Sequence, residues 1–269
     1  VDKINLPAND EKRNFVKIMN PLGEETSVMR TTLIPNMLDV ISTNISHKVE
    51  EVSAFECGNT FIPQEGLPIE TKKYCVGMYG KEVDFFVLKG VIESVLNNVG
   101  LKGYEIEPET TNLTFHPGRC AKIVYNNIYI GTFGELHPDV IENYNLGQRV
   151  YVAEINIDTV FENLNLTKSY NPLPKYPSTS RDIALIVKDE VFVKQIEDII
   201  KANGEDLVES YKLFDVYKGS QIAEGYKSIA YSITYRSKDK TLTDDDVNKV
   251  HHNIIRELEE KLDAKLRSN

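Results

Sequence analysis

The chain has 269 residues, of which 41% are hydrophobic and 27% are charged, and its formal net charge is −10. This length and apolar content suit two soluble domains with proper cores and exclude a disordered or fibrous chain. No apolar run approaches the roughly 20 residues that cross a bilayer, and the acidic balance excludes a strongly basic nucleic-acid binder, so we expect neither a membrane nor DNA as a partner.

The three cysteines, Cys57, Cys75 and Cys120, have no metal-ligand spacing and cannot all pair with one another. We expect all three to be buried as small apolar side chains, in a reducing compartment such as the cytoplasm. The chain begins with Val1 and has no signal-like segment, so we expect it to be a piece of a longer protein.

The first domain is predicted to span residues 1–171. The segments Leu33–Asn44 and Phe85–Asn98 carry the broad apolar face of an amphipathic helix. Strands are predicted at Glu51–Glu56, Thr60–Pro63, Lys73–Tyr79, Ala121–Tyr125, Ile128–Leu136 and Val150–Ile157. Asn126–Asn127 is a hairpin turn signal. Because turns join the strands as often as helices do, the pattern favours an antiparallel α+β sheet over a doubly wound parallel one.

Three motifs in this domain could carry out chemistry or bind a ligand, and each also has a structural explanation. His116, Glu135 and His137 are residue types for acid–base work or a metal, but a proline follows each histidine and favours an extended or turn conformation there. Gly131–Gly134 lies inside a hairpin and opens no helix, so it is not a dinucleotide loop. A substrate could be held by Glu24, Glu25 and Arg30, although a turn leading into a capped helix explains that segment better.

A linker separates the two domains, because Tyr170–Pro177 contains three prolines, which remove backbone donors and disfavour helix. The second domain, residues 172–269, alternates in the order strand, helix, strand, strand, helix, short strand. The predicted bounds are Arg181–Asp189, Val191–Asn203, Leu207–Tyr217, Lys227–Arg236, Asp244–Leu262 and Ala264–Arg267. This is the split βαβ order of the ferredoxin-like fold, in which helices cover one face of a sheet and leave the other open.

Two features of the last predicted helix have competing explanations. Thr243–Asp246 could hold a cation, but a capping box with acids at the positive helix end explains it more simply. His251 lies on the apolar face of the helix, four residues from Val247, so we expect it to be a packed core side chain.

Period-two alternation divides the strand side chains between the two faces of this sheet. The bulkier set, which includes Phe214 and Val216, is predicted to lie under the helices. The other set is small and polar: Asp182, Ala184, Ile186, Asp215, Tyr217, Ser228, Ala230, Ser232 and Thr234. Small residues let a planar base approach, a tyrosine ring stacks on it for about 1–3 kcal/mol, and a carboxylate accepts from a guanine edge. The alternative is a face kept polar for solubility.

Several motifs together resemble the bacterial phenylalanyl-tRNA synthetase β subunit family. The second domain is similar to its ferredoxin-fold anticodon-binding domain at Arg181–Ala184, Leu213–Gly219, Lys227–Ala230 and Thr241–Asp244. The first resembles its catalytic-like region at Asn20–Leu22, Met29–Thr31, Phe55–Gly58, Asp84–Gly90, His116–Arg119 and Gly134–Pro138. The resemblance runs in order over essentially the whole chain.

The resemblance implies a heterotetramer of two α and two β subunits that attaches phenylalanine to tRNA(Phe) with ATP and Mg²⁺, the chemistry belonging to the α subunit. The first domain is then an inactive class II synthetase-type domain that contacts the α subunit, with no catalytic residue, cofactor or metal of its own. Carried over by motif, the anticodon contacts fall on Ala184, Asp215, Tyr217 and Ser228.

The arginines of the first domain fit this loss of activity. A site that forms an adenylate needs arginines on the ATP phosphates, typically one two residues before an acid and another in a glycine-rich turn. Residues 1–170 contain Arg13, Arg30, Arg119 and Arg149, and none has either context. Two rival hypotheses are a ligand-sensing regulatory ferredoxin-like module fused to a scaffold domain, and an enzyme in which His116, Glu135 and His137 converge in one cleft.

Overall fold

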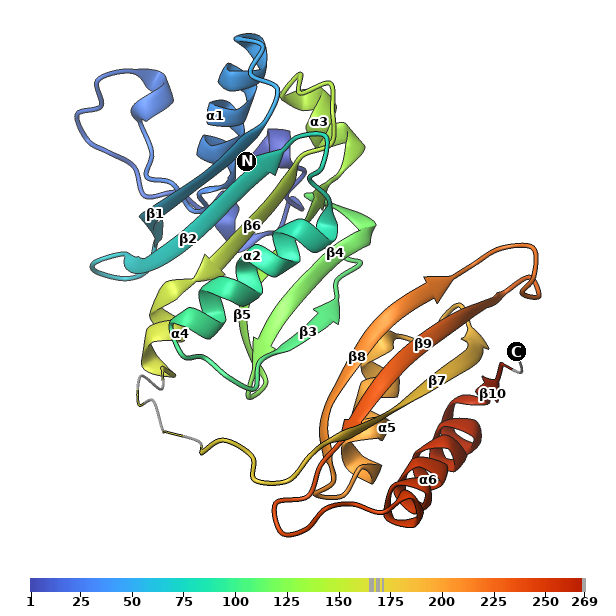
Figure 1. Ribbon diagram of the computed structural model, residues 1–269. Helices are drawn as coiled ribbons and strands as arrows, with labels where there is room; N and C mark the ends of the chain where they lie inside the picture. The colour runs from blue at the N-terminus through green and yellow to red at the C-terminus, as the bar shows by residue number, and fades with distance from the viewer. Residues whose placement is uncertain (165–166, 168–169, 171, 268–269) are drawn as a thin grey trace. The chain divides into compact units, whose positions relative to one another are not determined.

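The computed structural model describes residues 1–164, 167, 170 and 172–267. The chain divides into two compact units, Val1–Lys168 and Ser169–Asn269, which are described separately (Figure 1). The predicted boundary between residues 171 and 172 touches a position outside the described residues and stays a prediction.

The first unit is built on six antiparallel strands in the order β1-β2-β6-β5-β4-β3. In chain order they are β1 (Val52–Ile62), β2 (Ile69–Tyr79), β3 (Glu105–Pro108), β4 (Phe115–Tyr125), β5 (Ile128–Leu136) and β6 (Tyr151–Asn156). Asn126 and Asn127 have φ angles of 48° and 64°, the left-handed conformation of a tight hairpin turn, as predicted.

Helices pack on both faces of this sheet because alternate strand residues bury apolar side chains on opposite sides. On one face α1 (Ile34–Ser46) and α3 (Pro138–Asn143) share a core with Cys75, Tyr79 and Val152. On the other, α2 (Phe85–Asn98) packs with Val76, Met78 and Ala153, and α4 (Ile157–Glu162) adds Val160. Three short 3₁₀ turns precede α1, namely η1 (Asp2–Ile4), η2 (Glu11–Arg13) and η3 (Glu24–Thr26).

Several predicted bounds in this unit are wrong. β1 is one strand rather than two, because its ladder with β2 runs unbroken from Val52 to Ile62 through Gly58. The Arg30 guanidinium occupies the space that a Cβ of Gly58 would fill. β4 begins at Phe115 and includes the His116-Pro117 motif in extended form. The elements β3, α3 and α4 are too short for periodicity to reveal them. Cys57 is exposed on β1, whereas Cys75 and Cys120 are buried as expected.

The second unit is a four-stranded antiparallel sheet in the order β10-β7-β9-β8, the strand order of the ferredoxin-like fold. Its elements are β7 (Thr179–Lys188), α5 (Val193–Asn203), β8 (Val208–Tyr217), β9 (Tyr226–Tyr235), α6 (Asp244–Leu262) and β10 (Lys265–Leu266). Both units are α+β and antiparallel, so the predicted fold class is confirmed.

Both helices of the second unit cover one face of its sheet (Figure 1). Ile229, Tyr231 and Ile233 of β9 are fully buried against them, and burying each such side chain stabilises the fold by roughly 1.5–3 kcal/mol. The predicted capping box of α6 is present: the Thr243 side chain accepts from the Asp246 N–H, and the Asp246 carboxylate accepts from the Thr243 N–H.

Candidate nucleic-acid interface

The second unit presents a small, polar sheet face opposite its helices, and the register of the strands assembles the four predicted contact residues there. Ala184 of β7 and Asp215 of β8 both lie opposite Ala230 of the central strand β9. One row further along, Tyr217 of β8 lies opposite Ser228. Directly opposed residues project from the same face of a sheet, so these residues form two adjacent rows on one face.

A β-bulge in β8 places these residues, and it corrects the predicted alternation. Leu213 pairs with Tyr231 and Asp215 with Ala230, so Phe214 is an extra residue without a partner in the ladder. Because of the bulge, Leu213 rather than Phe214 packs against the hydrophobic core. Phe214 and Val216 are each 53% exposed, so their predicted burial under the helices is wrong.

Accessibility differs among the four predicted residues. Asp215 is exposed, while Ala184 and Tyr217 are partly buried. Ser228 is only 3% exposed, which differs from the open position expected for it. The alanines at positions 184 and 230 leave the middle of the face without bulky side chains, so a planar ring can approach the backbone there.

Arg267, a residue outside the four predicted contacts, contacts Ser228. The Arg267 N–H donates to the Ala184 carbonyl at 2.9 Å, which continues the β10–β7 pairing by one residue. The guanidinium Nη1 then reaches the Ser228 Oγ at 3.5 Å, and its Cζ lies 5.8 Å from the centre of the Tyr217 ring. The sequence contained a signal for this contact. The predicted final strand ends at Arg267, and once that strand pairs beside Ala184 it brings the arginine to the same face.

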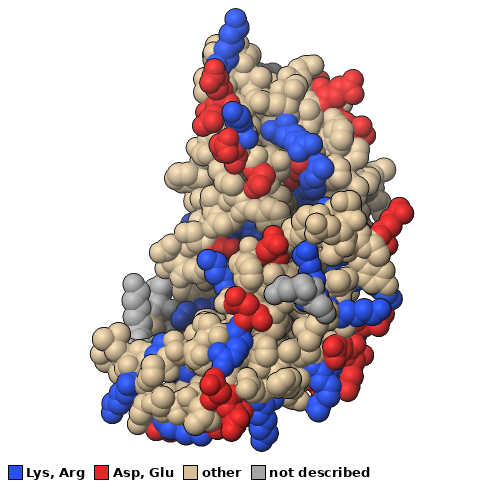
Figure 2. All heavy atoms as spheres, turned by 45° about the vertical axis from the view of Figure 1, so that its right-hand side comes forward, with Lys and Arg blue, Asp and Glu red and all other residues tan. Residues whose placement is uncertain are grey.

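Lys218 and Lys227, at one end of this sheet, are held by groups of Asp189, whereas Lys212 and Lys265 lie opposite Ser232 and Ile186 on the open face and are exposed. Lys218 Nζ lies 2.5 Å from an Asp189 carboxylate oxygen, and Lys227 Nζ donates to the Asp189 carbonyl at 2.8 Å. Burial lowers the pKa of Lys227. The predicted basic group after β9 is also partly neutralised, since Arg236 pairs with Glu209 and Lys240 with Asp246. Figure 2 shows basic and acidic side chains intermingled on the side in view.

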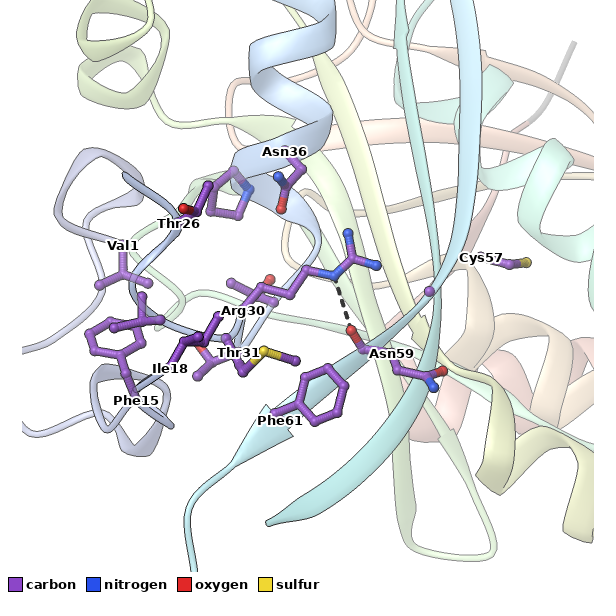
Figure 3. A pocket seen from close by; sticks show the side chains of 15 residues that line it. Val1, Phe15, Ile18, Thr26, Arg30, Thr31, Asn36, Cys57, Asn59 and Phe61 are labelled. Atoms are coloured by element: carbon purple, nitrogen blue, oxygen red, sulfur yellow. Dashed lines mark hydrogen bonds between the residues drawn. The ribbon is translucent and has the colours of Figure 1, made fainter. Parts of the chain in front are cut away.

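The arginines of the first unit are all engaged with protein groups. Arg30 donates to the Asn59 carbonyl at 3.0 Å and to Glu56 at 2.6 Å, and it lines a hollow of about 870 Å³ between the N-terminal loop and β1 (Figure 3). Arg13 donates to the carbonyl groups of Leu6 and Pro7. These bonds give Arg30 a structural role at the end of the loop that leads into α1.

The three residues of the predicted acid–base set, His116, Glu135 and His137, each have different hydrogen-bond partners. Glu135 is 5% exposed and accepts from Arg119 at 2.9 Å and from the Tyr151 hydroxyl at 3.3 Å, with Arg149 3.7 Å away. The ring nitrogen of His116 instead accepts from the Gly118 N–H at 3.1 Å, and that of His137 accepts from the Asp139 N–H at 3.2 Å. Each histidine therefore bonds the backbone two residues further along its own segment.

His251 in α6 is partly buried, whereas a packed core side chain was expected. Its Nδ1 is 2.9 Å from the Tyr235 hydroxyl, and burial, with smaller contributions from His252 and Arg181, lowers its pKa.

No three His, Cys, Asp or Glu side chains among the described residues are grouped so as to hold a metal ion. A search of those same residues finds no helix with the length and apolar character needed to cross a bilayer.

The fold defines an α+β protein in which a ferredoxin-fold unit follows a six-stranded antiparallel unit. The family model for the phenylalanyl tRNA synthetase beta chain CLM domain matches residues 1–157, and the model for the ferredoxin-fold anticodon binding domain matches residues 174–267. The chain belongs to the phenylalanyl-tRNA synthetase beta chain family.

Curated relatives agree with the family. The chain is 47% identical over 269 residues to the phenylalanine–tRNA ligase beta subunit of Clostridium tetani, 46% to that of Clostridium acetobutylicum and 37% to that of Symbiobacterium thermophilum. Each alignment covers 99% of this chain but only 34%, 34% and 31% of the relative. The chain thus spans about a third of the length of these relatives.

Proposed function

We propose that this chain is a non-catalytic part of a phenylalanine–tRNA ligase, in which the second unit binds the anticodon of tRNA(Phe). The observation that carries the proposal is the pair of cross-strand rows that gathers Ala184, Asp215, Tyr217 and Ser228 on the face without helices. A loop of RNA needs such a face, because its unpaired bases are bound by stacking and by contacts to their edges.

Each residue has a role that its chemistry supports. Tyr217 offers a partly exposed ring for stacking, and Asp215 is an exposed carboxylate that accepts from the amino and imino groups of a guanine edge. Ala184 keeps the face low enough for the base to lie flat. Ser228 supplies a hydroxyl that donates or accepts a hydrogen bond once the Arg267 side chain moves away from it.

The first unit is proposed to be a scaffold for the catalytic α subunit rather than a site of adenylate formation. This role is supported by the hydrogen bonds of its arginines. They donate to Glu56, Glu135 and backbone carbonyl groups instead of pointing together at one anion site. Met19 and Leu22 are fully exposed on the loop before α1, and exposed apolar side chains suit a protein partner.

In the assembled enzyme, proposed as a cytoplasmic heterotetramer of two α and two β subunits, ATP and Mg²⁺ would act in the α subunit. The contribution of this chain is positioning: a grip on the anticodon places the distant acceptor end of the tRNA in the active site.

Titration with tRNA(Phe) tests the proposal. Tyr217→Ala is expected to weaken binding by roughly 1–3 kcal/mol, the value of one base stacked on an aromatic ring. Tyr170→Ala is the matched control, because Tyr170 is 86% exposed and lies outside the sheet. In the complete enzyme, Tyr217→Ala is expected to leave phenylalanine adenylation unchanged. Equal tRNA affinity of the Tyr217 variant and the parent chain would refute the assignment.

A further inference from the structure

The Arg267 side chain is held on the candidate RNA face by neutral groups. Besides the long contact to Ser228, its Nη2 donates to the Gln221 side-chain oxygen at 3.3 Å, and the guanidinium lies over Tyr217. Within residues 172–267, each partner described for this guanidinium is uncharged. The positive charge of Arg267 is therefore not compensated by the contacts that hold it.

Two basic side chains at this end of the sheet, Lys218 and Lys227, differ in that respect; Lys265, opposite Ile186, is a further exposed cation on the same face. Lys218 pairs with the Asp189 carboxylate and Lys227 donates to the Asp189 carbonyl, so both are already committed to the same turn. Arg267 is partly exposed and stands beside the residues expected to receive the base. Of Lys218, Lys227 and Arg267, the last is the one with a charge available for an anionic ligand.

The contacts of Arg267 are also weak enough to rearrange. Hydrogen bonds of 3.3 and 3.5 Å are longer than the usual 2.7–3.2 Å range, and a Cζ at 5.8 Å from a ring centre is near the outer limit of a cation–π contact. The backbone is fixed instead, through the bond from the Arg267 N–H to Ala184. The residue thus has an anchored main chain and a side chain that can turn.

We propose that Arg267 is a phosphate-binding residue of this face, and that its guanidinium contacts a backbone phosphate next to the nucleotide that stacks on Tyr217. The inference rests on the proposed function of the second unit and deepens it. A guanidinium presents a planar fork of donors that matches a phosphate in a bidentate arrangement, which neither serine nor glutamine replaces. When the side chain turns to the phosphate, it also uncovers the Ser228 hydroxyl and the ring of Tyr217.

Salt dependence separates a phosphate contact from a structural role. The 269-residue chain is titrated with tRNA(Phe) at several salt concentrations, for the parent, Arg267→Gln and Arg267→Lys. Loss of one phosphate contact to a single strand lowers the slope of log K against log salt by about 0.7, which is roughly a fivefold weaker affinity at 0.1 M salt and little difference near 1 M. Arg267→Lys keeps the charge and is expected to keep the slope.

Arg256→Gln is the matched control, because Arg256 is an exposed arginine on α6, in the helix layer on the other face of the sheet, and the substitution changes the net charge equally. It is expected to leave the slope unchanged. Thermal unfolding of each variant confirms that the second unit is folded, which is expected because Arg267→Gln retains the backbone bond to Ala184.

Three outcomes would overturn the inference: an unchanged affinity in Arg267→Gln, a tighter affinity, or a weaker affinity with an unchanged slope. The last would mean that Arg267 only positions Tyr217 and Ser228. A Tyr217→Ala arm separates the two proposals. If Tyr217→Ala weakens binding and Arg267→Gln does not, the phosphate role alone fails; if neither changes binding, the proposed anticodon site fails as well.

Discussion

The buried carboxylate of Glu154 gives a prediction whose size follows from its contacts. Helix α1 begins after Leu33, which has no side-chain oxygen with which to cap it. Glu154 of β6 performs that task from the sheet, since its Oε1 accepts from the Leu33 N–H and from the Thr32 hydroxyl, each at 2.7 Å. Leu33 and Thr32 are 0% and 2% exposed, so water does not replace the carboxylate without rearrangement.

Glu154→Ala leaves these two buried donors without their acceptor. Each costs about 1–3 kcal/mol, and the lost negative charge at the helix N-terminus adds about 0.3–1 kcal/mol. Relief of the desolvation of the carboxylate offsets part of this, so we expect a loss of about 3–5 kcal/mol in the free energy of unfolding of the first unit. Glu154→Gln keeps an acceptor oxygen and is expected to cost only about 1–2 kcal/mol, the charge-assisted part of the two bonds.

Chemical denaturation followed by far-UV circular dichroism measures both changes, with the transitions of the two units fitted separately. Glu107→Gln is the matched control, because Glu107 lies on the same sheet but pairs with Lys122 near the surface, where an ion pair is worth about 0–1 kcal/mol. The reasoning is wrong if Glu154→Gln costs as much as Glu154→Ala, or if both cost less than the control.

Three further predictions concern the second unit. The folded-state pKa of His251 lies below its ordinary value of 6.5, so the unfolded chain binds the proton more readily. The contribution of neutral His251 to stability is therefore complete above pH 6.5 and falls as the pH drops below that value. His251→Gln should flatten this dependence of the free energy of unfolding on pH. A Cβ added at Gly219 would stand 2.5 Å from the Tyr217 hydroxyl. Gly219→Ala should therefore move the Tyr217 ring and weaken tRNA binding without changing the melting temperature. Unaltered tRNA binding would show that the position of the ring is unimportant. Thr243→Ala should cost about 1 kcal/mol of stability through the lost helix cap, and a change below about 0.3 kcal/mol would contradict that role.

The longer elements were predictable because their periodicity is strong. The predicted bounds of α2, β5 and α6 coincide with the observed ones, since each has an uninterrupted apolar pattern and a clear start signal such as Asp84 or Thr243. The sequence predicted two strands where β1 is one, because the ladder that pairs Cys57, Gly58 and Asn59 with β2 is a tertiary feature that local pattern does not specify.

The sequence predicted that the four candidate residues share one sheet face, but not the detail of that face. Alternation placed Ala184, Asp215 and Tyr217 on one face correctly, although the bulge at Phe214 that sets the register of β8 leaves no signal in a single sequence. The contact between Ser228 and Arg267 was missed because the two residues are 39 positions apart along the chain. Contacts of that kind depend on tertiary placement, which local pattern does not specify.

The central claim is that the sheet face without helices is where the anticodon lies. Photo-crosslinking from position 217 tests it directly, with a benzophenone amino acid in place of Tyr217 and tRNA(Phe) as the target. We expect an adduct on a nucleotide of the anticodon loop, and a much weaker adduct from the same group at position 170. An adduct that maps to the acceptor stem, or equal yields from the two positions, would contradict it.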